Sequence, residues 1–512
     1  MMKNAKRVTT HVLVFALCLT TFFTGSSADA KAKKPKLSNK SITLTKGKTK
    51  TLKVSRTKKC KVSWKTSNKK IVSLSKKKRT SCRLKGVKKG TAKITCKVKK
   101  GKKTTKLICK VRVKAKKTVV ATSLKNAYKD IVPYMGSALN YGSPSDPGEL
   151  QKSNTLKFVK QHFNSFTLEN EMKPDSILGS SATTISVAKA KSMGYYIPAG
   201  YTESNVPQLN FSRIDKALEV AKNNGLKMRA HTLVWHSQTP SWFFTQGYSG
   251  SKVVSATTMD ARLEFYVHNV MGHVMDKEKA LTGAAGNIVY AWDVVNEYLH
   301  RPNYAFFKTW TSVYGNMEDS PSYVKKAFEI AYDMLKKYDA QDKVTLFYND
   351  YNTYFGVEET LNLVNFINKD EPAKICGGIG MQSHVDVKVP TVSQYGEALE
   401  KFLASGYEVQ ITELDFTINF DTEGATASYS YVNEHETDAD QAKFVKNLMQ
   451  TILTKQKNRD KTVNPKGITG ITLWGLCDAT SWRSQCAPLL FDTSIYDPKP
   501  SYYSFLEAAK IW

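Results

Sequence analysis

At 512 residues the chain is too long for one ordinary hydrophobic core, which predicts two or more folded units. The net charge of +33 comes from one segment: residues 31–117 contain 36 Lys and Arg and no Asp or Glu, while residues 118–512 contain 38 basic and 43 acidic residues. This division excludes any assignment of function from the isoelectric point of the whole chain.

The N-terminus has the features of a secretory signal peptide. Basic residues at positions 3, 6 and 7 precede an apolar run over residues 12–23 and the small-residue pattern Ala28-Asp29-Ala30. The run is too short to span a bilayer core of about 30 Å, and no later stretch approaches about 18 uninterrupted apolar residues. We therefore predict a signal peptide over residues 1–30, cleavage after Ala30, and a secreted, extracellular chain without a membrane span.

Residues 31–114 alternate apolar and polar side chains in short runs separated by glycines. This period-two pattern predicts a small antiparallel all-β sandwich with Lys facing outward. The phrases SITLTKGKTKTLKV, VSWKTSNKKIVSLS and GTAKITCKV resemble the bacterial immunoglobulin-like domain group 2. The predicted strands cover residues 41–45, 51–54, 62–64, 71–74, 92–98 and 107–113, and a basic linker is expected over residues 115–122.

The charge of this unit has two possible explanations. Outward Lys residues keep strand edges from pairing with other chains, which would make the charge a solvated surface. That explanation does not account for the complete lack of acids, and a field of one sign attracts polyanions. We therefore expect the unit to bind an anionic cell-wall polymer or an acidic polysaccharide, with cell-wall association as one consequence. Nucleic acid is not expected as a partner, because the chain is predicted to be exported and the segment lacks an aromatic stacking platform.

Seven cysteines remain after the predicted cleavage, and an exported chain can form disulfides. The sequence does not fix their connectivity. Three pairings remain open, namely Cys96 with Cys109 across a hairpin, Cys60 with Cys82, and Cys477 with Cys486, while Cys376 is expected to be a buried apolar residue. The spacings do not match a zinc site, and we expect neither a metal nor another cofactor.

From residue 123 to residue 512 the pattern changes to helical periods that alternate with short apolar runs. Helices are predicted over residues 211–224, 321–338, 357–368 and 438–455. The eight predicted strands cover residues 136–139, 163–170, 226–235, 288–297, 344–352, 378–384, 409–415 and 468–475. Repeated strand-then-helix order over about 390 residues predicts an α/β fold, the (β/α)8 TIM barrel, with its active site at the carboxyl ends of the strands.

Polar side chains stand at or just beyond the end of nearly every predicted strand. One such ending would be unremarkable, since strand ends reach the surface, but seven on one rim indicate a site. The residues are Glu169, Asn170 and Lys173; His231 and Trp235; Asn296 and Glu297; Tyr351 and Asn352; Gln382 and His384; Glu413 and Asp415; and Trp474, followed by Trp482. Trp292 and Asp293 are instead expected in the core, and Asp350 is expected to support its loop.

This set of residues suits chemistry on sugars. The chain has no Gly-x-Ser-x-Gly elbow and no His-Glu-x-x-His helix. Trp rings stack on the apolar faces of a pyranose, and amide and carboxyl groups bond its hydroxyls. Glycoside hydrolysis needs two carboxyl groups, and Glu297 and Glu413 end the fourth and seventh predicted strands, where they can face each other across the barrel mouth.

The motifs FTLENEMKPD, HTLVWHSQTPSWF, WDVVNE, YNDYN, GIGMQSH and ITELD, with the later LWG and SW, resemble family 10 glycoside hydrolases, the endo-β-1,4-xylanases. The resemblance covers residues 123–512. It implies that Glu297 is the acid/base and Glu413 the nucleophile of a retaining double displacement on xylan. It also implies that Asn296 binds the sugar 2-hydroxyl, and that Asp415 orients His384, which bonds the nucleophile.

The resemblance further implies which residues bind the sugar chain. The glycone subsites would be formed by Glu169, Asn170, Lys173, His231, Trp235 and Gln382, roofed by Trp474 and Trp482, with Tyr351 and Asn352 toward the aglycone side. Two departures from the family pattern, Pro174 after Lys173 and the WGLCDATSW loop, put the outer glycone subsites in doubt. A β-1,4-glucanase on the same scaffold and a non-hydrolytic carbohydrate adhesin are the alternatives, and the presence of both Glu297 and Glu413 disfavours the adhesin.

Overall fold

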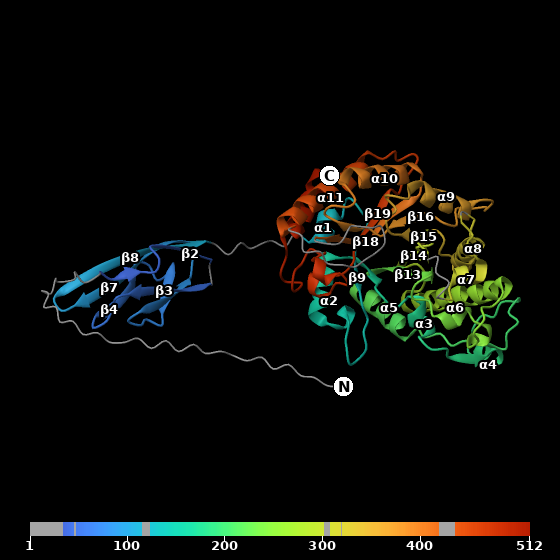
Figure 1. The fold of residues 1–512 in the computed structure, drawn as a ribbon, viewed down its shortest axis with the longest axis horizontal. Helices are drawn as coiled ribbons and strands as arrows, with labels where there is room; N and C mark the ends of the chain where they lie inside the picture. The colour runs from blue at the N-terminus through green and yellow to red at the C-terminus, as the bar shows by residue number, and fades with distance from the viewer. Residues whose placement is uncertain (1–33, 46–47, 115–122, 302–307, 319, 419–435) are drawn as a thin grey trace, which may run out of the picture. The chain divides into compact units, whose positions relative to one another are not determined.

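A computed structural model describes residues 34–45, 48–114, 123–301, 308–318, 320–418 and 436–512 (Figure 1). The chain divides into two compact units, and the boundary falls between Ala121 and Thr122. Each unit has its own hydrophobic core. The predicted signal peptide, residues 1–30, and the predicted linker, residues 115–122, lie outside the described residues.

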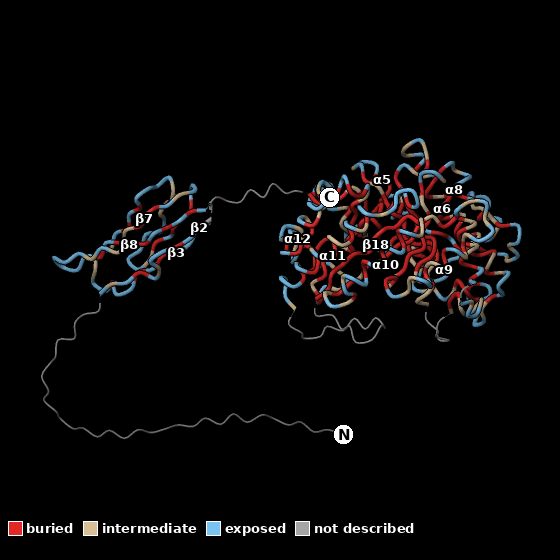
Figure 2. The backbone as a smooth tube through the Cα atoms, turned by 90° about the horizontal axis from the view of Figure 1, so that it is seen from above, coloured by how far each residue is buried: buried red, intermediate tan, exposed pale blue. Residues whose placement is uncertain are grey.

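The N-terminal unit consists of two four-stranded sheets, ordered β1-β3-β6-β5 and β2-β8-β7-β4. Inward side chains such as Leu52, Trp64 and Ile94 are buried, and exposed Lys residues alternate with them, so the tube in Figure 2 changes colour along these strands. The predicted small all-β unit is confirmed. Its strands are β1 (Lys36–Leu37), β2 (Ser41–Thr45), β3 (Thr49–Ser55), β4 (Lys61–Thr66), β5 (Val72–Ser75), β6 (Ser81–Gly86), β7 (Gly90–Lys100) and β8 (Lys103–Lys114).

Two details of the predicted sandwich are wrong. Strand β2 pairs with β8 in parallel, with Ser41 opposite Lys110, so this sheet is not purely antiparallel. The prediction also missed β1 and β6, because β1 has two residues and β6 offers few apolar side chains. Alternation indicates which side chains face inward, but it does not indicate which strands are neighbours or how they are directed.

All seven described cysteines are free thiols, so none of the three pairings left open by the sequence is formed. In the hairpin of β7 and β8, Cys96 lies opposite Leu107 and Cys109 lies opposite Ile94. The two cysteines therefore occupy diagonal positions on the inward face and are not direct cross-strand partners. Cys376 is fully buried, as predicted.

The C-terminal unit is a closed barrel of eight parallel strands within the described residues, which confirms the predicted fold class. The barrel closes where β16 pairs with β18 and where β19 pairs with β9. Each of the eight predicted runs overlaps one of its strands. They are β9 (Tyr134–Leu139), β10 (Ser165–Leu168), β13 (Lys227–Trp235), β14 (Val289–Asn296), β15 (Thr345–Asp350), β16 (Gly378–Met381), β18 (Glu408–Thr417) and β19 (Ile468–Leu473).

Helices surround this barrel (Figure 1). All four predicted helices are present, as α5, α8, α9 and α11. The helices are α1 (Leu124–Tyr128), α2 (Ser153–His162), α3 (Pro174–Leu178), α4 (Val187–Ser192), α5 (Ser212–Asn224), α6 (Ala256–Thr282), α7 (Trp310–Tyr314), α8 (Ser322–Lys337), α9 (Val357–Asn368), α10 (Val392–Ala404), α11 (Asp438–Asn458) and α12 (Pro500–Ala508). Three short strands lie outside the closed ring, namely β11 (Thr184–Ser186), β12 (Asn205–Pro207) and β17 (His384–Asp386).

The barrel strands are buried on both faces, as parallel strands under a helical layer must be. Every residue of β14 and β18 is buried, and β18 lies in the red interior of Figure 2. Amphipathic helices cover them. Helix α5, for example, buries Ile214 and Leu218 and is followed by Gly225, whose φ of 64° is left-handed. In the described part of the chain, no helix has both the length and the apolar character that crossing a membrane requires.

Candidate active site

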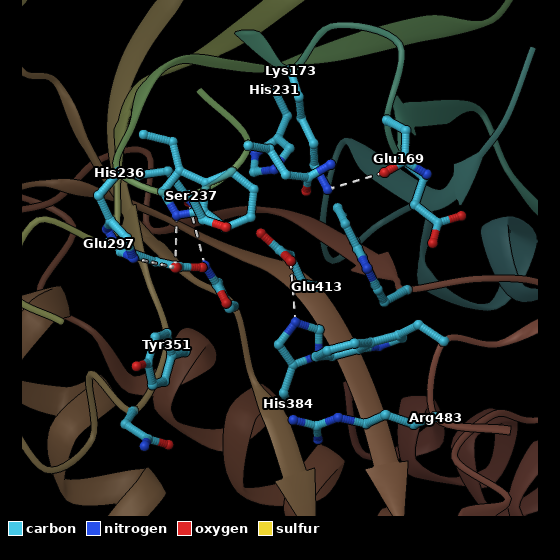
Figure 3. A pocket seen from close by; sticks show the side chains of 18 of the residues that line it. Glu169, Lys173, His231, His236, Ser237, Glu297, Tyr351, His384, Glu413 and Arg483 are labelled. Atoms are coloured by element: carbon cyan, nitrogen blue, oxygen red, sulfur yellow. Dashed lines mark hydrogen bonds and ion pairs between the residues drawn. The ribbon is translucent and has the colours of Figure 1, made fainter. Parts of the chain in front are cut away.

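A cavity of about 790 Å³ lies at the carboxyl ends of the barrel strands (Figure 3). Both carboxyl residues singled out in the sequence, Glu297 and Glu413, line this cavity. The twelve predicted sugar-binding residues also line it, namely Glu169, Asn170, Lys173, His231, Trp235, Asn296, Tyr351, Asn352, Gln382, His384, Trp474 and Trp482. Asp415 is not part of the lining and lies behind His384. The strand-end pattern therefore brought these side chains together, as predicted.

Glu297 follows the last residue of β14, where the backbone turns out of the strand. Its φ is 57°, in the left-handed region, and its N–H donates to the carbonyl of Asn349, 2.9 Å away. The carboxyl group accepts two hydrogen bonds, from Trp235 Nε1 to Oε2 at 2.7 Å and from Gln382 Nε2 to Oε1 at 2.8 Å. This turn explains why an apolar run ends on a carboxyl residue, because it aims Glu297 into the cavity.

The surroundings of Glu297 favour its protonated form. Burial raises the pKa of Glu297, and the charge of Asp350 raises it further. The charge of Glu413 also raises this pKa, but by less. The hydrogen bonds from Gln382 and Trp235 act against this rise, and the resulting pKa is about 7. Glu297 can therefore hold a proton near neutral pH and donate it to a leaving group.

The surroundings of Glu413 favour its ionised form. Asn349 Nδ2 donates to Oε1 at 2.8 Å, and His384 Nε2 lies 3.1 Å from Oε2. Burial alone would raise the pKa of Glu413, but the His384 hydrogen bond and the charges of His231 and His384 outweigh burial and lower it to about 2. Glu413 is therefore a carboxylate at neutral pH, as a nucleophile must be.

His384 connects Glu413 to Asp415. Its Nδ1 lies 2.8 Å from Asp415 Oδ2, which also accepts a hydrogen bond from Trp482 Nε1 at 3.1 Å. Burial lowers the pKa of His384, but Asp415 and Glu413 together raise it above its usual value. The ring is therefore held with one nitrogen toward each carboxylate, which fits the expected orienting role of Asp415.

A continuous hydrogen-bond network connects the two glutamates. Gln382 Nε2, which donates to Glu297, also lies 3.3 Å from Asn296 Oδ1. Asn349 Nδ2 lies 2.8 Å from both Asn296 Oδ1 and Glu413 Oε1. The same network of buried amides thus positions both carboxyl groups. Figure 3 shows the side chains of Glu297 and Glu413 on either side of one open space.

Three polar side chains from the loop after β10, those of Glu169, Asn170 and Lys173, form another wall of the cavity. Asn140 Nδ2 donates to Glu169 Oε2 at 2.6 Å, and Lys173 Nζ donates to Asn170 Oδ1 at 3.3 Å. Lys173 also lies 5.1 Å from the centroid of the Trp235 ring, a distance suited to a cation–π contact. Burial lowers the pKa of Lys173, and the neighbouring carboxylates, led by Glu413, partly offset that effect.

Aromatic side chains define the rest of the opening. Trp474 is buried edge-on against His231 and His384, whereas Trp482 is 42% exposed and packs against His384. On the other side the Tyr351 ring stacks on His300, with 4.0 Å between centroids. The cavity therefore offers aromatic surface on two sides of the carboxyl pair, as a sugar chain requires.

Sequence reasoning assigned no catalytic or binding role to part of the site. Asn349 binds Glu413, His236 Nε2 lies 3.9 Å from Glu297 Oε2, and the Arg483 guanidinium lies 4.4 Å from the Trp482 ring centroid. Asp350 was assigned to its loop, yet it is the strongest charge acting on Glu297. Asn349 and Asp350 stand in the YNDYN motif and could have been found there, whereas Arg483 follows the SW motif and carried no spacing signal.

The loop after β19 is held without a bridge between Cys477 and Cys486. Asp478 accepts hydrogen bonds from Lys499 Nζ at 2.9 Å and from the Leu489 N–H at 2.6 Å. This buried ion pair, and not a disulfide, anchors the loop that carries Trp482. Within the described residues, no group of three or more His, Cys, Asp or Glu side chains is placed to hold a metal ion.

The arrangement supplies a neutral acid and an ionised carboxylate in one cavity. The family described as Glycosyl hydrolase family 10 matches residues 123–508. Endo-1,4-beta-xylanase A of Butyrivibrio fibrisolvens is 43% identical over 361 residues, which are 70% of this chain and 79% of that relative.

Two of the solved structures that resemble the chain are informative here. The CBM22-1–GH10 modules of Clostridium thermocellum xylanase 10B, complexed with xylohexaose, give a TM-score of 0.58 at 26% identity over 82% of this chain and 80% of that one. A bacterial Ig-like domain containing GH10 xylanase from termite gut gives 0.55 at 23% identity over 92% and 98% of the two chains, which is evidence for the fold alone.

Proposed function

The chain belongs to glycosyl hydrolase family 10, and on that premise we propose that it is a secreted endo-1,4-β-xylanase that cleaves internal bonds of xylan with retention of configuration. The observation that carries the proposal is the opposite perturbation of two carboxyl groups in one cavity. The pKa of Glu297 is raised to about 7 and that of Glu413 is lowered to about 2. A retaining glycosidase needs one acid and one nucleophile in these states.

In the first step, Glu413 attacks the anomeric carbon while Glu297 gives its proton to the departing glycosidic oxygen. The bond from the anomeric carbon to that oxygen breaks, and a covalent glycosyl ester forms on Glu413. Esterification removes the negative charge of Glu413, so the pKa of Glu297 falls. In the second step Glu297 takes a proton from water, which attacks the same carbon and releases Glu413.

Six further residues support these steps. Asn296 bonds the 2-hydroxyl of the attacked sugar, because its side chain lies between the two carboxyl groups in the amide network. His384, held by Asp415, keeps Glu413 ionised and oriented. Trp474 and Trp482 bound the glycone side, and Tyr351 supplies a platform on the aglycone side.

The N-terminal residues 1–30 direct export in this proposal, and residues 31–114 hold the protein on an anionic polymer at the cell wall or in the substrate. The charge of residues 31–117 supports the second part, because 36 bases are balanced by no acid within the segment.

The rates of hydrolysis of xylan and of soluble cellulose test the substrate preference. Proton NMR of the first product released tests whether the anomeric configuration is retained. We expect reducing sugar from xylan, with the β-anomer formed first. Equal or faster hydrolysis of cellulose would favour the glucanase, and binding of xylan without hydrolysis would favour the adhesin. The Glu413→Ala variant is the control, because it keeps the fold while it removes the nucleophile.

A further inference from the structure

The two outer faces of the N-terminal sandwich carry different amounts of charge. Outward positions follow from alternation with the buried residues of each strand. The β1-β3-β6-β5 sheet presents four exposed bases at such positions, namely Lys36, Lys53, Arg83 and Lys85. The β2-β8-β7-β4 sheet presents nine, namely Lys61, Lys65, Lys93, Lys97, Lys99, Lys106, Lys110, Arg112 and Lys114. We call the outer surface of this second sheet the cationic face.

The strand register also distinguishes the two faces, because it places bases opposite bases on the cationic face only. On the cationic face, bases stand directly opposite bases in three cross-strand pairs, which are Lys61 with Lys99, Lys97 with Lys106, and Lys93 with Lys110. Like charges in directly opposite positions destabilise a sheet. Residues 31–117 contain no acid that could relieve this repulsion within the segment. The cationic face therefore carries a cost in stability that an external anion would remove.

The opposite face avoids such pairs. Every outward base there stands across from Ser or Thr; Lys53, for example, lies opposite Ser81, and Lys85 lies opposite Thr49. Arg83 also donates from Nε to Thr49 Oγ1 at 3.3 Å. On a face that only contacts solvent, outward Lys and Arg residues are thus placed so that they do not repel one another. This contrast argues that the base pairs of the cationic face serve a ligand.

An uncharged cross-strand pair with one exposed apolar side chain interrupts the charge at the middle of the cationic face. Ile108 is 47% exposed and lies opposite Thr95. This pair separates the rows Lys93–Lys110 and Lys97–Lys106, each two residues away along the strands, or roughly 7 Å. A ligand that covers the face must therefore meet cations on both sides of a small uncharged strip. A chain of sugar rings with carboxylate branches has that combination of apolar faces and separated charges.

We propose that the cationic face binds a polysaccharide bearing carboxylates, such as xylan substituted with uronic acid, with each opposed Lys pair contacting one carboxylate. This inference rests on the proposed binding of an anionic polymer by residues 31–114, and it names the face and the polymer. A bound carboxylate would lie between two ammonium groups and cancel their repulsion. Binding of the branched substrate by this unit would raise the local concentration of xylan around the enzyme.

Two matched variants of the full mature chain test the proposal. The face variant carries Lys97→Gln and Lys110→Gln, and the control variant carries Lys53→Gln and Lys85→Gln on the opposite sheet. Both lose two charges, so any effect of net charge alone is equal. All proteins also carry Glu413→Ala to prevent hydrolysis while their Kd for uronic-acid-substituted xylan is measured by isothermal titration calorimetry.

We expect the face variant to bind about fivefold more weakly or worse, and the control variant to change Kd by less than about twofold. Equal losses in both variants would overturn the assignment of the face. Tighter binding of the unmutated face to a phosphate-bearing wall polymer or to DNA than to the substituted xylan would overturn the assignment of the polymer. Binding to substituted xylan that does not weaken with salt would instead overturn the underlying binding role of residues 31–114.

Thermal unfolding checks that the variants are folded. Removing repulsion should leave the face variant at least as stable as the parent, whereas a lower melting temperature than that of the control variant would contradict the argument from register. Lys97→Arg with Lys110→Arg keeps the charge and should keep the affinity. A loss of binding in that folded Arg variant would show that charge on this face is not what the polymer recognises. If either Gln variant does not fold, Lys→Thr at the same positions replaces it.

Discussion

Replacing Asp350 by Asn tests the electrostatic origin of the acid/base. The pKa of Glu297 rises from 4.5 to about 7, a difference worth roughly 3.4 kcal/mol in favour of the protonated form. Burial is the largest cause and the Asp350 charge is the second. Asparagine keeps the shape of Asp350 and removes its charge, so it should remove only the second contribution. We expect the pKa of Glu297 to fall by roughly 0.5 to 1 pH unit, or about 0.7 to 1.4 kcal/mol.

The direction in the activity profile follows from the role of Glu297. The enzyme needs Glu297 protonated, so kcat/KM is lost as pH rises through its pKa, and a lower pKa moves this alkaline limb to lower pH. His300 opposes this shift without reversing it. Burial lowers the pKa of His300, and the Asp350 hydrogen bond at 2.8 Å and the Asp350 charge raise it, so without that charge His300 loses its proton more easily. The lost positive charge favours protonated Glu297, but Asp350 is the largest charge acting on Glu297, so its removal decides the direction.

The assay is kcat/KM for a soluble xylo-oligosaccharide as a function of pH. Asp260→Asn serves as the control, since Asp260 pairs with Lys326 on the outside of the barrel and does not line the cavity. The control should leave the alkaline limb in place. An Asp350→Asn limb that stays at its original pH or moves upward would refute the electrostatic argument.

The remaining predictions concern the same cavity. Trp235→Phe removes a hydrogen bond that lowers the pKa of Glu297, so the alkaline limb should move to higher pH; a downward shift would contradict this. His384→Ala should raise the pKa of Glu413. The acid limb of the kcat/KM profile should therefore move to higher pH. Glu413→Ala should abolish turnover of both xylan and activated aryl xylosides, and azide should restore an inverted product. Glu297→Ala should spare the first step for aryl xylosides with good leaving groups, and the opposite pattern in these two variants would exchange the assigned roles.

Most of the cavity could be predicted because the barrel converts order along the chain into position. Every parallel strand ends at the same rim, so polar residues at strand ends converge without knowledge of any contact. Glu297, at the end of β14, and Glu413, within β18, both follow this rule. The sequence therefore sufficed to name fourteen of the residues that line the cavity, but not others such as His236 and Arg483.

The electrostatics could not be predicted in the same way, because they depend on side-chain directions and distances. Trp235 was expected to stack on sugar, yet its Nε1 donates to Glu297. Asp350 was assigned to its loop, although its charge acts on the same carboxyl group. Strand position does not distinguish a residue that touches substrate from one that sets the protonation state of its neighbour.

In the N-terminal unit, alternation predicted which residues are buried but not which strands are neighbours. The parallel pairing of β2 with β8 and the diagonal placement of Cys96 and Cys109 both depend on register. Register is set by the packing of two sheets, which short alternating runs do not encode individually. The same register produces the opposed Lys pairs of the cationic face.

Trapping the covalent intermediate tests the central claim most directly. A 2-deoxy-2-fluoro xylobioside with a good leaving group should inactivate the enzyme, and mass spectrometry of its peptides should locate the sugar on Glu413. In a crystal structure of that adduct, the carboxyl carbon of Glu297 should lie about 5 to 5.5 Å from that of Glu413. A label on another residue, or a separation of about 6.5 Å or more with no adduct, would contradict the retaining mechanism and the pairing of these two glutamates.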